Sequence, residues 1–295
     1  MNGSVIVRGL TRDGSARIIL ADTSEIVQKA HEIHGLSKTM TAALGRALTA
    51  ASLMGSTLKG ENDSLTLRFK GNGPAGTICC VSDSNGNVRG YADNPYAELP
   101  PNDKGKLDVG GAVGAGTMYV MRDLGLAEPY IGMSEIVSGE IAEDITQYYV
   151  SSEQTPTVCA LGVKVNKDFS CRAAGGFLLQ LMPYPDEKII DKLESNIPKI
   201  SSVSTMIDEG MTLGEIAGVI LDGIEFDLLD ENPIAYKCPC SREKYHSAIK
   251  SLKIEDLREL YESGEAVEAC CNFCGSKYRF ETEEVGEMLA EREDR

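Results

Sequence analysis

Tryptophan is absent from this chain of 295 residues, and histidine occurs only three times, as His31, His34 and His246. Few side chains are therefore available for histidine-based catalysis. Basic residues are also scarce, since 29 Lys and Arg stand against 45 Asp and Glu, which gives a net charge of -16. Because binding to nucleic acid or anionic lipid is driven by basic surface, this balance argues against both kinds of partner.

Long apolar runs are missing as well. No stretch reaches the ~18 consecutive apolar residues of a membrane-spanning helix, and residues 1–8 lack the apolar region of a signal peptide. We therefore expect a cytoplasmic protein without a membrane partner. In that reducing compartment nine cysteines indicate metal or redox chemistry rather than a framework of structural disulfides.

The first 182 residues alternate strand and helix patterns, which predicts an α+β core domain with a mixed α/β order of elements. Strands are expected over 4–10 and 16–22, joined by a turn at Asp13-Gly14. Helices are expected over 24–34 and 41–58. The other predicted elements of this domain are strands over 65–70, 77–82, 88–92 and 158–165, and a helix over 140–151.

The composition changes after this domain, and residues 183–231 are predicted to form an acidic helical linker. Between Ile200 and Tyr236 there are eight acidic residues and no Lys or Arg. Like charges should therefore repel one another along this segment. Its apolar residues recur at helical spacing, so we expect it to fold against a neighbouring surface.

One helix of this linker is expected to be only weakly stable. Thr212 and Glu215 match a capping box that opens a helix through Ile220. Four glycines lie within and around that helix, namely Gly210, Gly214, Gly218 and Gly223. Because an interior glycine costs about 1 kcal/mol relative to alanine, the linker is predicted to be metastable.

The strongest chemical pattern is two pairs of closely spaced cysteines, Cys238 with Cys240 and Cys271 with Cys274. Tetrahedral zinc accepts four thiolate ligands, and closed sites of this kind are structural. We therefore predict one zinc ion per chain, held by these four residues. Zinc thiolates also remain open to oxidation, and conversion to disulfides removes the ligands.

The pairs belong to a small C-terminal domain, predicted over 232–295. Short helices are expected between them, over 241–252 and 254–261. The apolar content of this domain is low, which predicts a marginal core. Metal binding, which contributes about 10–16 kcal/mol in structural zinc sites, would then hold the fold together.

The remaining cysteines give weaker signals. Four of them lie in or beside apolar strand patterns and are expected to be buried, namely Cys79, Cys80, Cys159 and Cys171. Cys159 could act as a nucleophile only with a base, which no local motif supplies. Cys270, next to Cys271, is an extra thiol that either exchanges as a ligand or takes no part.

Three further groups are interpreted without a functional role. The glycine-rich segment 110–116 lacks the order of a phosphate-binding loop and is expected to be a turn. His31 and His34 could form a metal pair but are expected to be solvated helix residues. Glu140 with the acidic doublet 143–144 is expected to lie on a solvated helix face rather than to perform acid–base chemistry. No catalytic residue is assigned, and the protein is predicted not to be an enzyme.

Nearly the whole chain resembles one known family. Beside the two cysteine pairs, the resemblance rests on core strings such as Arg122-Asp123-Leu124-Gly125-Leu126, Ser138-Gly139-Glu140-Ile141-Ala142-Glu143-Asp144, Ser152-Glu153-Gln154-Thr155-Pro156 and Ala173-Ala174-Gly175-Gly176. The chain is similar in these strings to the heat shock protein 33 chaperones, which are redox-regulated holdases of the cytosol. The family's ligand cysteines correspond to Cys238, Cys240, Cys271 and Cys274, whereas Cys270 falls outside the pattern.

The resemblance implies a protein that is inactive when reduced and zinc-bound. Oxidation would form the disulfides Cys238–Cys240 and Cys271–Cys274, release zinc, unfold the C-terminal domain and free the linker. The exposed apolar surface would then bind unfolding proteins without ATP during oxidative stress. The resemblance also implies unfolded client proteins as partners and a homodimer in the oxidised state.

Two other classes of function remain open. A zinc-ribbon interaction module that binds RNA would need a basic face around the cysteines, but Lys237, Arg242 and Lys244 are offset by acidic residues. A thiol oxidoreductase would use Cys271 and Cys274, but their motif lies outside any β-α-β pattern. Salt-dependent RNA binding would favour the first class, and turnover in insulin reduction would favour the second.

Overall fold

The computed structural model describes residues 3–293, and the chain divides into two compact units, Met1–Lys237 and Cys238–Arg295. The first unit contains two five-stranded antiparallel sheets, and the second contains a two-stranded ribbon with helices. Within the described range, no helix combines the length and the apolar character that crossing a membrane requires.

Sheet A combines strands from the beginning and the end of the first unit. Its strand order is β10-β1-β2-β9-β8, with bounds Phe226–Pro233, Val5–Thr11, Ala16–Asp22, Cys171–Leu181 and Thr157–Val165. β1 and β2 form the expected hairpin, in which Gly14 adopts a left-handed φ of 78°. β8 and β10 are the edge strands.

Sheet B has the order β5-β4-β3-β6-β7, with bounds Val88–Ala92, Thr77–Asp83, Ser64–Gly71, Gly116–Asp123 and Tyr130–Glu135. Each neighbouring pair is antiparallel. Short helices flank these strands, α3 at Val109–Val113 and α4 at Ala142–Ser151. The glycine-rich segment 110–116 therefore forms α3, a turn and the start of β6, rather than a turn alone.

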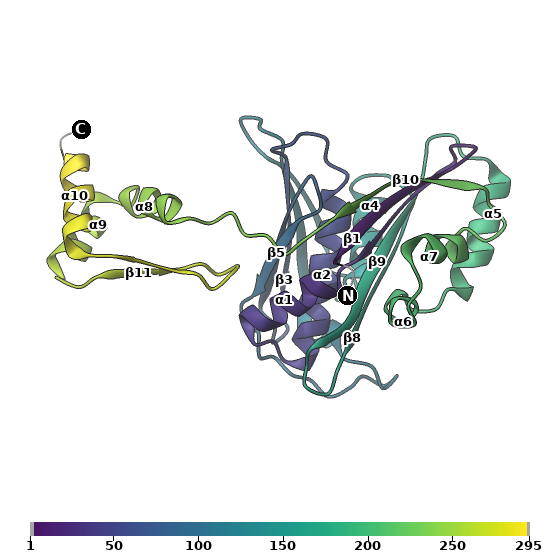
Figure 1. Cartoon of the computed structure of the whole chain (residues 1–295), viewed down its shortest axis with the longest axis horizontal. Helices are drawn as coiled ribbons and strands as arrows, with labels where there is room; N and C mark the ends of the chain where they lie inside the picture. The colour runs from purple at the N-terminus through teal and green to yellow at the C-terminus, as the bar shows by residue number, and fades with distance from the viewer. Residues whose placement is uncertain (1–2, 294–295) are drawn as a thin grey trace. The chain divides into compact units, whose positions relative to one another are not determined.

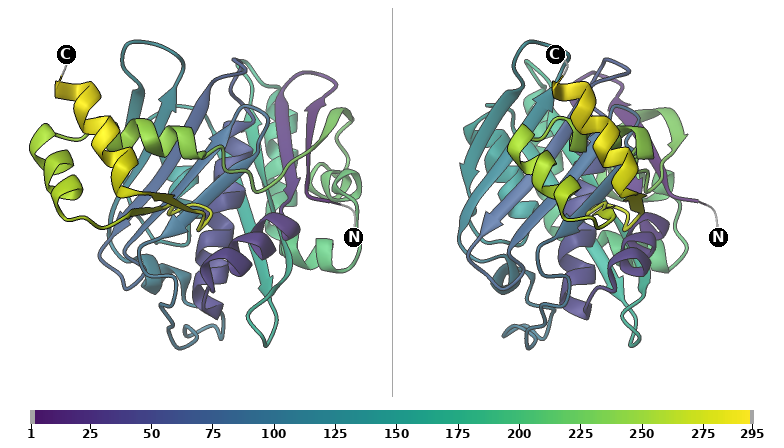
Figure 2. Two further views of the ribbon diagram at one scale, coloured as in Figure 1. Left: turned by 60° about the vertical axis from the view of Figure 1, so that its left-hand side comes forward. Right: turned by 90° about the vertical axis from the view of Figure 1, so that its left-hand side faces the viewer.

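Helix α2, Lys38–Gly55, packs against strands of both sheets (Figures 1 and 2). Ser37 begins it by accepting a hydrogen bond from the Met40 N–H (3.1 Å). All of its residues are buried except Lys38 and Arg46. α1, Ser24–His34, precedes it and ends at Gly35 in the predicted left-handed conformation. The two helices thus form the main core between the sheets.

Three helices cover the opposite face of sheet A (Figure 1). They are α5 at Glu187–Asn196, α6 at Val203–Asp208 and α7 at Leu213–Ile220, with a 3-10 turn at Ile197–Lys199. Val203, Met206 and Ile216 are almost fully buried in a second core with Leu20 and Phe177 of the sheet. The predicted capping box is present, because Thr212 and Glu215 each bond to the other's backbone N–H.

The end of the acidic segment differs from the helical linker predicted from the sequence. Residues 226–233 form strand β10, which pairs antiparallel with β1. Here the unpaired edge of β1 decides the structure, since pairing satisfies its backbone groups. Residues 234–237 also pack within the first unit, where the Lys237 N–H donates to the Val88 C=O (3.0 Å).

In the packed state, basic residues of the core offset part of the self-repulsion expected for this segment. Arg8 pairs with Asp230 (3.1 Å), and Arg12 with Asp227 (3.2 Å). In α6, Asp208 accepts from both Arg172 of β9 (2.6 Å) and Lys164 of β8 (2.9 Å). Hydrogen bonds from Arg172 and Lys164 lower the pKa of Asp208. The carboxylate therefore favours docking of α6 above its unfolded pKa, and this contribution is lost as the pH falls through the folded pKa.

The second unit is small. It contains α8 at Arg242–Lys250, α9 at Ile254–Glu262, β11 at Val267–Cys270, β12 at Lys277–Phe280 and α10 at Thr282–Glu293. Among its described residues, the hydrophobic core cluster consists of Ile249, Leu257, Phe280, Val285, Met288 and Leu289. A core of this size gives little stability by itself. The division into a core domain 1–182, a linker 183–231 and a switch domain 232–295 remains a prediction about which parts unfold independently.

Candidate metal centre

The β11–β12 ribbon places one cysteine pair in its connecting loop. The Cys271 N–H donates to the Ser276 C=O (2.9 Å), and the Gly275 N–H donates to the Cys271 C=O (2.8 Å). Gly275 adopts a φ of 70°, which a side chain would strain. This tight turn brings Cys271 and Cys274 to the same side of the loop.

The other pair lies just before α8. Ser241 begins this helix by accepting from the Lys244 N–H (3.3 Å). The Lys244 ammonium also donates to the Pro239 C=O (2.7 Å). The residue between Cys238 and Cys240 is therefore fixed to the first turn of the helix.

The four sulfur atoms form one cluster. All of them lie within 4.8 Å of one another. Sγ of Cys240 lies 3.3 Å from Sγ of Cys274, and Sγ of Cys238 lies 3.7 Å from Sγ of Cys271. Four sulfurs at ~2.3 Å from a tetrahedral zinc ion are about 3.8 Å apart. The thiols predicted as ligands therefore meet at a spacing that fits zinc.

Two tyrosines contact this cluster. The hydroxyl of Tyr278 lies 3.2 Å from Sγ of Cys240, and Tyr245 is hydrogen bonded to Cys271. Their rings stack with centroids 4.9 Å apart. The hydrogen bond to Cys240 and burial raise the pKa of Tyr278 to about 12. Both hydroxyls therefore stay protonated at neutral pH and can donate to thiolates, as outer-sphere partners of metal ligands do.

The thiols differ in acidity. For Cys271, burial opposes ionisation, but hydrogen bonds from Tyr245 and from the N–H groups of Cys274 and Phe273 outweigh it and lower its pKa to about 6. Burial raises the pKa of Cys238 to about 12. A metal ion would replace this uneven arrangement by four ligated thiolates.

Sequence reasoning missed both tyrosines. A weak signal existed, because Tyr278 follows Cys274 by four residues and Tyr245 follows Cys240 by five. Aromatic residues at such spacings are common in small cores. Only the fold shows that both hydroxyls reach the sulfurs.

Cys270 lies outside the cluster, as the sequence pattern indicates. It is exposed at the end of β11, and its thiol lies 3.8 Å from the Gly275 carbonyl oxygen. The sulfur contacts of 3.3 and 3.7 Å join Cys240 to Cys274 and Cys238 to Cys271. These contacts run across the predicted disulfide pairs, so the pairing Cys238–Cys240 and Cys271–Cys274 remains a prediction.

Three of the four cysteines of the first unit are buried as expected from their apolar surroundings, and Cys171 is not. Cys79, Cys80 and Cys159 are buried, whereas Cys171 is half-buried. Burial raises the pKa of each of these thiols. They are therefore poor nucleophiles at neutral pH.

The interpretation of His31 and His34 as solvated residues is wrong in part. Both are half-buried. Nε2 of His34 lies 3.0 Å from the Gly90 carbonyl oxygen and 3.3 Å from the Tyr236 hydroxyl. This ring thus joins α1 to β5 and to the segment after β10.

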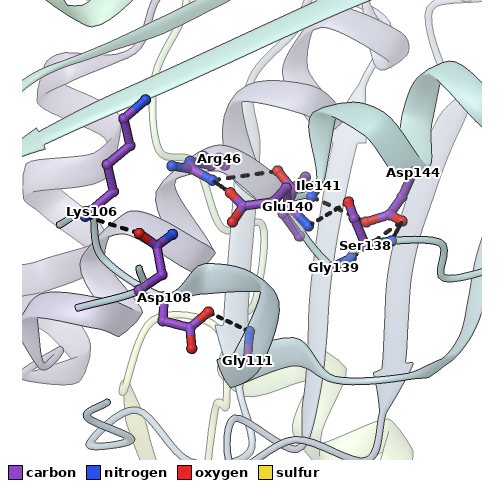
Figure 3. Close-up of polar contacts among 10 residues, drawn as sticks. Arg46, Lys106, Asp108, Gly111, Ser138, Gly139, Glu140, Ile141 and Asp144 are labelled. Carbon is purple, nitrogen blue, oxygen red and sulfur yellow. Dashed lines mark hydrogen bonds and ion pairs between the residues drawn. The ribbon is translucent and has the colours of Figure 1, made fainter. Parts of the chain in front are cut away.

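The acidic residues at the start of α4 are not a solvated face either (Figure 3). Asp144 is fully buried and accepts hydrogen bonds from the N–H groups of Val137 (2.7 Å), Ser138 (3.1 Å) and Ile141 (3.1 Å). Glu140 forms an ion pair with Arg46 of α2. The loop 137–141 wraps around Asp144, and this is what buries the carboxylate. Only Glu143 is exposed.

Comparison with known proteins covers the whole chain. The family model described as Hsp33 protein matches residues 4–281. A 33 kDa chaperonin of Clostridium botulinum (strain Alaska E43 / Type E3) is 47% identical over 285 residues, which cover 96% of this chain and 97% of that protein. The chain belongs to the Hsp33 family. Its α+β fold, as predicted from the sequence, is confirmed.

Two other members of the Hsp33 family are also similar to this chain over nearly its whole length. A 33 kDa chaperonin of Clostridium beijerinckii is 45% identical over 285 residues, which cover 96% of this chain and 97% of that protein. The crystal structure of a 33 kDa chaperonin (heat shock protein 33 homolog) from Thermotoga maritima matches with a TM-score of 0.91 and 35% identity over the full length of both chains.

Proposed function

We propose that this protein is an ATP-independent holdase whose client binding is switched on by oxidation. The observation that carries the proposal is the cluster of four thiols within 4.8 Å, set in a unit whose described part has a small hydrophobic core. The chaperonin names of the relatives support the class of activity. We further propose that unfolding client proteins are its partners, that it acts in the cytoplasm and that it dimerises when oxidised.

Zinc fits the cluster best among the metals, because four thiolates in a tetrahedral arrangement are its preferred structural ligands. Cys238, Cys240, Cys271 and Cys274 would hold it, with hydroxyl donors from Tyr245 and Tyr278. When bound, zinc ties the segment before α8 to the β11–β12 ribbon. Removal of the ligands would then cost the second unit most of its stability.

Oxidation supplies the switch. Peroxide takes two electrons from each thiol pair and is reduced to water, and each pair forms one disulfide. The proposed disulfides, Cys238–Cys240 and Cys271–Cys274, lie within each segment and no longer link the two segments. The second unit would unfold as a result.

Release of the helices on sheet A would expose the surface that binds clients. α5, α6 and α7 cover apolar residues of the sheet, including Leu20 and Phe177. The ion pairs of Asp208 with Arg172 and Lys164 are partly exposed, so solvent screens them and they hold α6 only weakly. Undocking would expose both the sheet face and the apolar face of the helices, which is the kind of surface that binds unfolded chains.

The experiment that tests this function measures zinc content and aggregation in the same samples. Protein that has been oxidised by peroxide should lose one zinc per chain and suppress light scattering by a thermally unfolding client, whereas reduced protein should do neither. Equal suppression by both forms would contradict the switch. Turnover in insulin reduction, or RNA binding that falls with salt, would favour one of the other two classes instead.

Gly218→Ala should raise the threshold for activation. Gly218 lies inside α7 with open space where a Cβ would be, so alanine should stabilise the docked helix by about 1 kcal/mol. At Gly214 a Cβ would lie 3.2 Å from Cδ1 of Leu228, which must shift, so the single change is preferred to the pair. Client capture should fall while peroxide still releases zinc.

The matched control is Gly210→Ala. Gly210 adopts a φ of 86°, where alanine is strained, so this variant should loosen the same segment. Hydrogen exchange of the α7 amides reports both effects. If Gly218→Ala protects α7 and clients are still captured as by the parent, then undocking of α7 does not expose the binding surface.

A further inference from the structure

Edge strand β8 borders an open groove of about 810 Å³. On one side the groove is lined by Lys38 and Arg46 of α2 and by Lys106 of the loop before α3. Figure 3 shows the side chains of Arg46 and Lys106. On the other side it is lined by Ile197 and Ile200, which lie between α5 and α6. The floor is β8 itself.

The outer edge of β8 has backbone groups without partners. At the end of β9, next to the first residue pair of β8, the Leu181 N–H donates to the Pro156 C=O (3.1 Å). Because antiparallel pairing alternates, the N–H and C=O groups of Leu161 and Val163 point away from β9. Throughout residues 3–293, no group forms a hydrogen bond with them on that side. An edge of this kind is a template for one more strand.

The beginning of the edge is closed and its second half is open. The Cys159 N–H donates to Thr146 Oγ1 of α4 (3.2 Å), so α4 occupies the edge there. The open portion, 161–165, has room for a short extended segment. A β-strand places successive side chains on opposite faces. Leu161 and Val163 share the α2 face of sheet A, whereas Val158 and Ala160 share the face covered by α5–α7.

The two walls differ in chemistry. Lys38 and Arg46 are the two residues of α2 that are not buried. The ammonium groups of Lys38 and Lys106 form no ion pair with any of residues 3–293. Arg46 pairs with Glu140, but its Nε is buried without a hydrogen-bond partner. This basic wall stands out in a chain of net charge -16, and it is complementary to carboxylates.

We propose that the β8 groove binds an extended client segment as an additional strand. Side chains of such a segment would alternate between the basic wall and the apolar wall of Ile197 and Ile200. The preferred segment therefore alternates acidic residues with β-branched apolar residues. The assignment of the occupant rests on the proposed holdase function, while the groove and its open edge are present before any release of the linker.

The test uses a labelled seven-residue peptide of alternating Glu and Val and the reduced full-length protein. Fluorescence anisotropy at low salt should show binding, and the Lys38→Glu, Lys106→Glu variant should bind about tenfold more weakly. The control variant, Lys59→Glu, Lys70→Glu, makes the same change in net charge at exposed lysines outside the groove. No binding, or equal weakening in both variants, would overturn the proposal.

Backbone methylation of the peptide tests the added strand itself. In an antiparallel strand the Glu residues would direct their N–H groups toward β8, so N-methyl groups on Glu would prevent this pairing. In a parallel strand the Val residues would do so, and N-methyl groups on Val would prevent that pairing. One of the two methylated peptides should lose binding and the other should retain it. Similar affinity of both would overturn the added strand. A parent protein that dimerises through the groove and ignores the peptide would assign the groove to a second copy and also overturn the proposal.

Client capture separates this proposal from the redox switch. The oxidised Lys38→Glu, Lys106→Glu variant should release zinc as the parent does but suppress client aggregation less. If it suppresses aggregation as the parent does, the groove proposal is wrong and the switch stands. If the oxidised parent itself captures no client, the holdase function is wrong, and the peptide data report on the groove alone.

Discussion

Ile216→Asp protein in the reduced, zinc-bound state should suppress client aggregation as the oxidised parent does. Ile216 is fully buried in α7, against the face of sheet A. A carboxylate at this position has no partner in an apolar core, and burying it would cost several kcal/mol. The helix should undock instead, since a helix of eight residues with two glycines has little stability of its own.

The matched control for this substitution is on the same helix. Val219 is 41% exposed, so Val219→Asp adds the same charge to α7 without burying it. This variant should stay inactive until it is oxidised. For both variants, light scattering by the client measures chaperone activity, and the zinc content is measured in the same samples. If reduced Ile216→Asp protein is folded, shows an exposed α7 by hydrogen exchange and captures no client, then linker release is insufficient for activity.

Cys274→Ser should have the second large effect, on the metal and on the second unit. The substitution removes one sulfur from a cluster in which all four lie within 4.8 Å. We expect the affinity for zinc to fall by more than about 100-fold, beyond the effect typical of an outer-sphere change. Because the described part of this unit has only a small hydrophobic core, its amides should lose protection from hydrogen exchange.

Cys270→Ser is the control for this loss. Its thiol is exposed, lies outside the cluster and contacts a backbone carbonyl. This variant should keep one zinc per chain and normal activation. In the double variant Cys270→Ser, Cys274→Ser, the Cys270 thiol can no longer take the place of Cys274 as a zinc ligand. Retention of one tightly bound zinc by that double variant, in competition with a chelator, would contradict the assigned ligands.

Local rules predicted the elements whose ends are marked by turn and cap residues. The hairpin at Gly14, the end of α1 at Gly35 and the capping box of α7 were all found in this way. Strand β9 was missed because Gly175 and Gly176 weaken its strand pattern. Neighbouring backbone groups require both glycines, since a Cβ on Gly175 would lie 2.4 Å from the Ala21 carbonyl oxygen and one on Gly176 would lie 2.6 Å from the Ala160 carbonyl oxygen. That close approach exists only in the folded chain.

At the candidate site, too, local patterns predicted some residues, whereas long-range contacts place the others. Thiolate spacing along the chain is enough to predict the four cysteines, because metal sites reuse a few ligand spacings. Tyr245 and Tyr278 reach the sulfurs only through the packing of α8 on β12. Asp144 looked like a surface acid, since nothing in its spacing shows that a loop wraps around it. Long-range contacts decided each residue that was missed.

The most direct test of the redox coupling is hydrogen exchange of the first unit while the second unit is oxidised. Amides of α6 and α7, residues 203–220, should lose protection in step with zinc release, and those of β3 and α2 should not change. The same samples, assayed with a client, should gain activity at the same extent of oxidation. If zinc is lost and clients are bound while residues 203–220 remain protected, the coupling between the thiol cluster and the linker is contradicted.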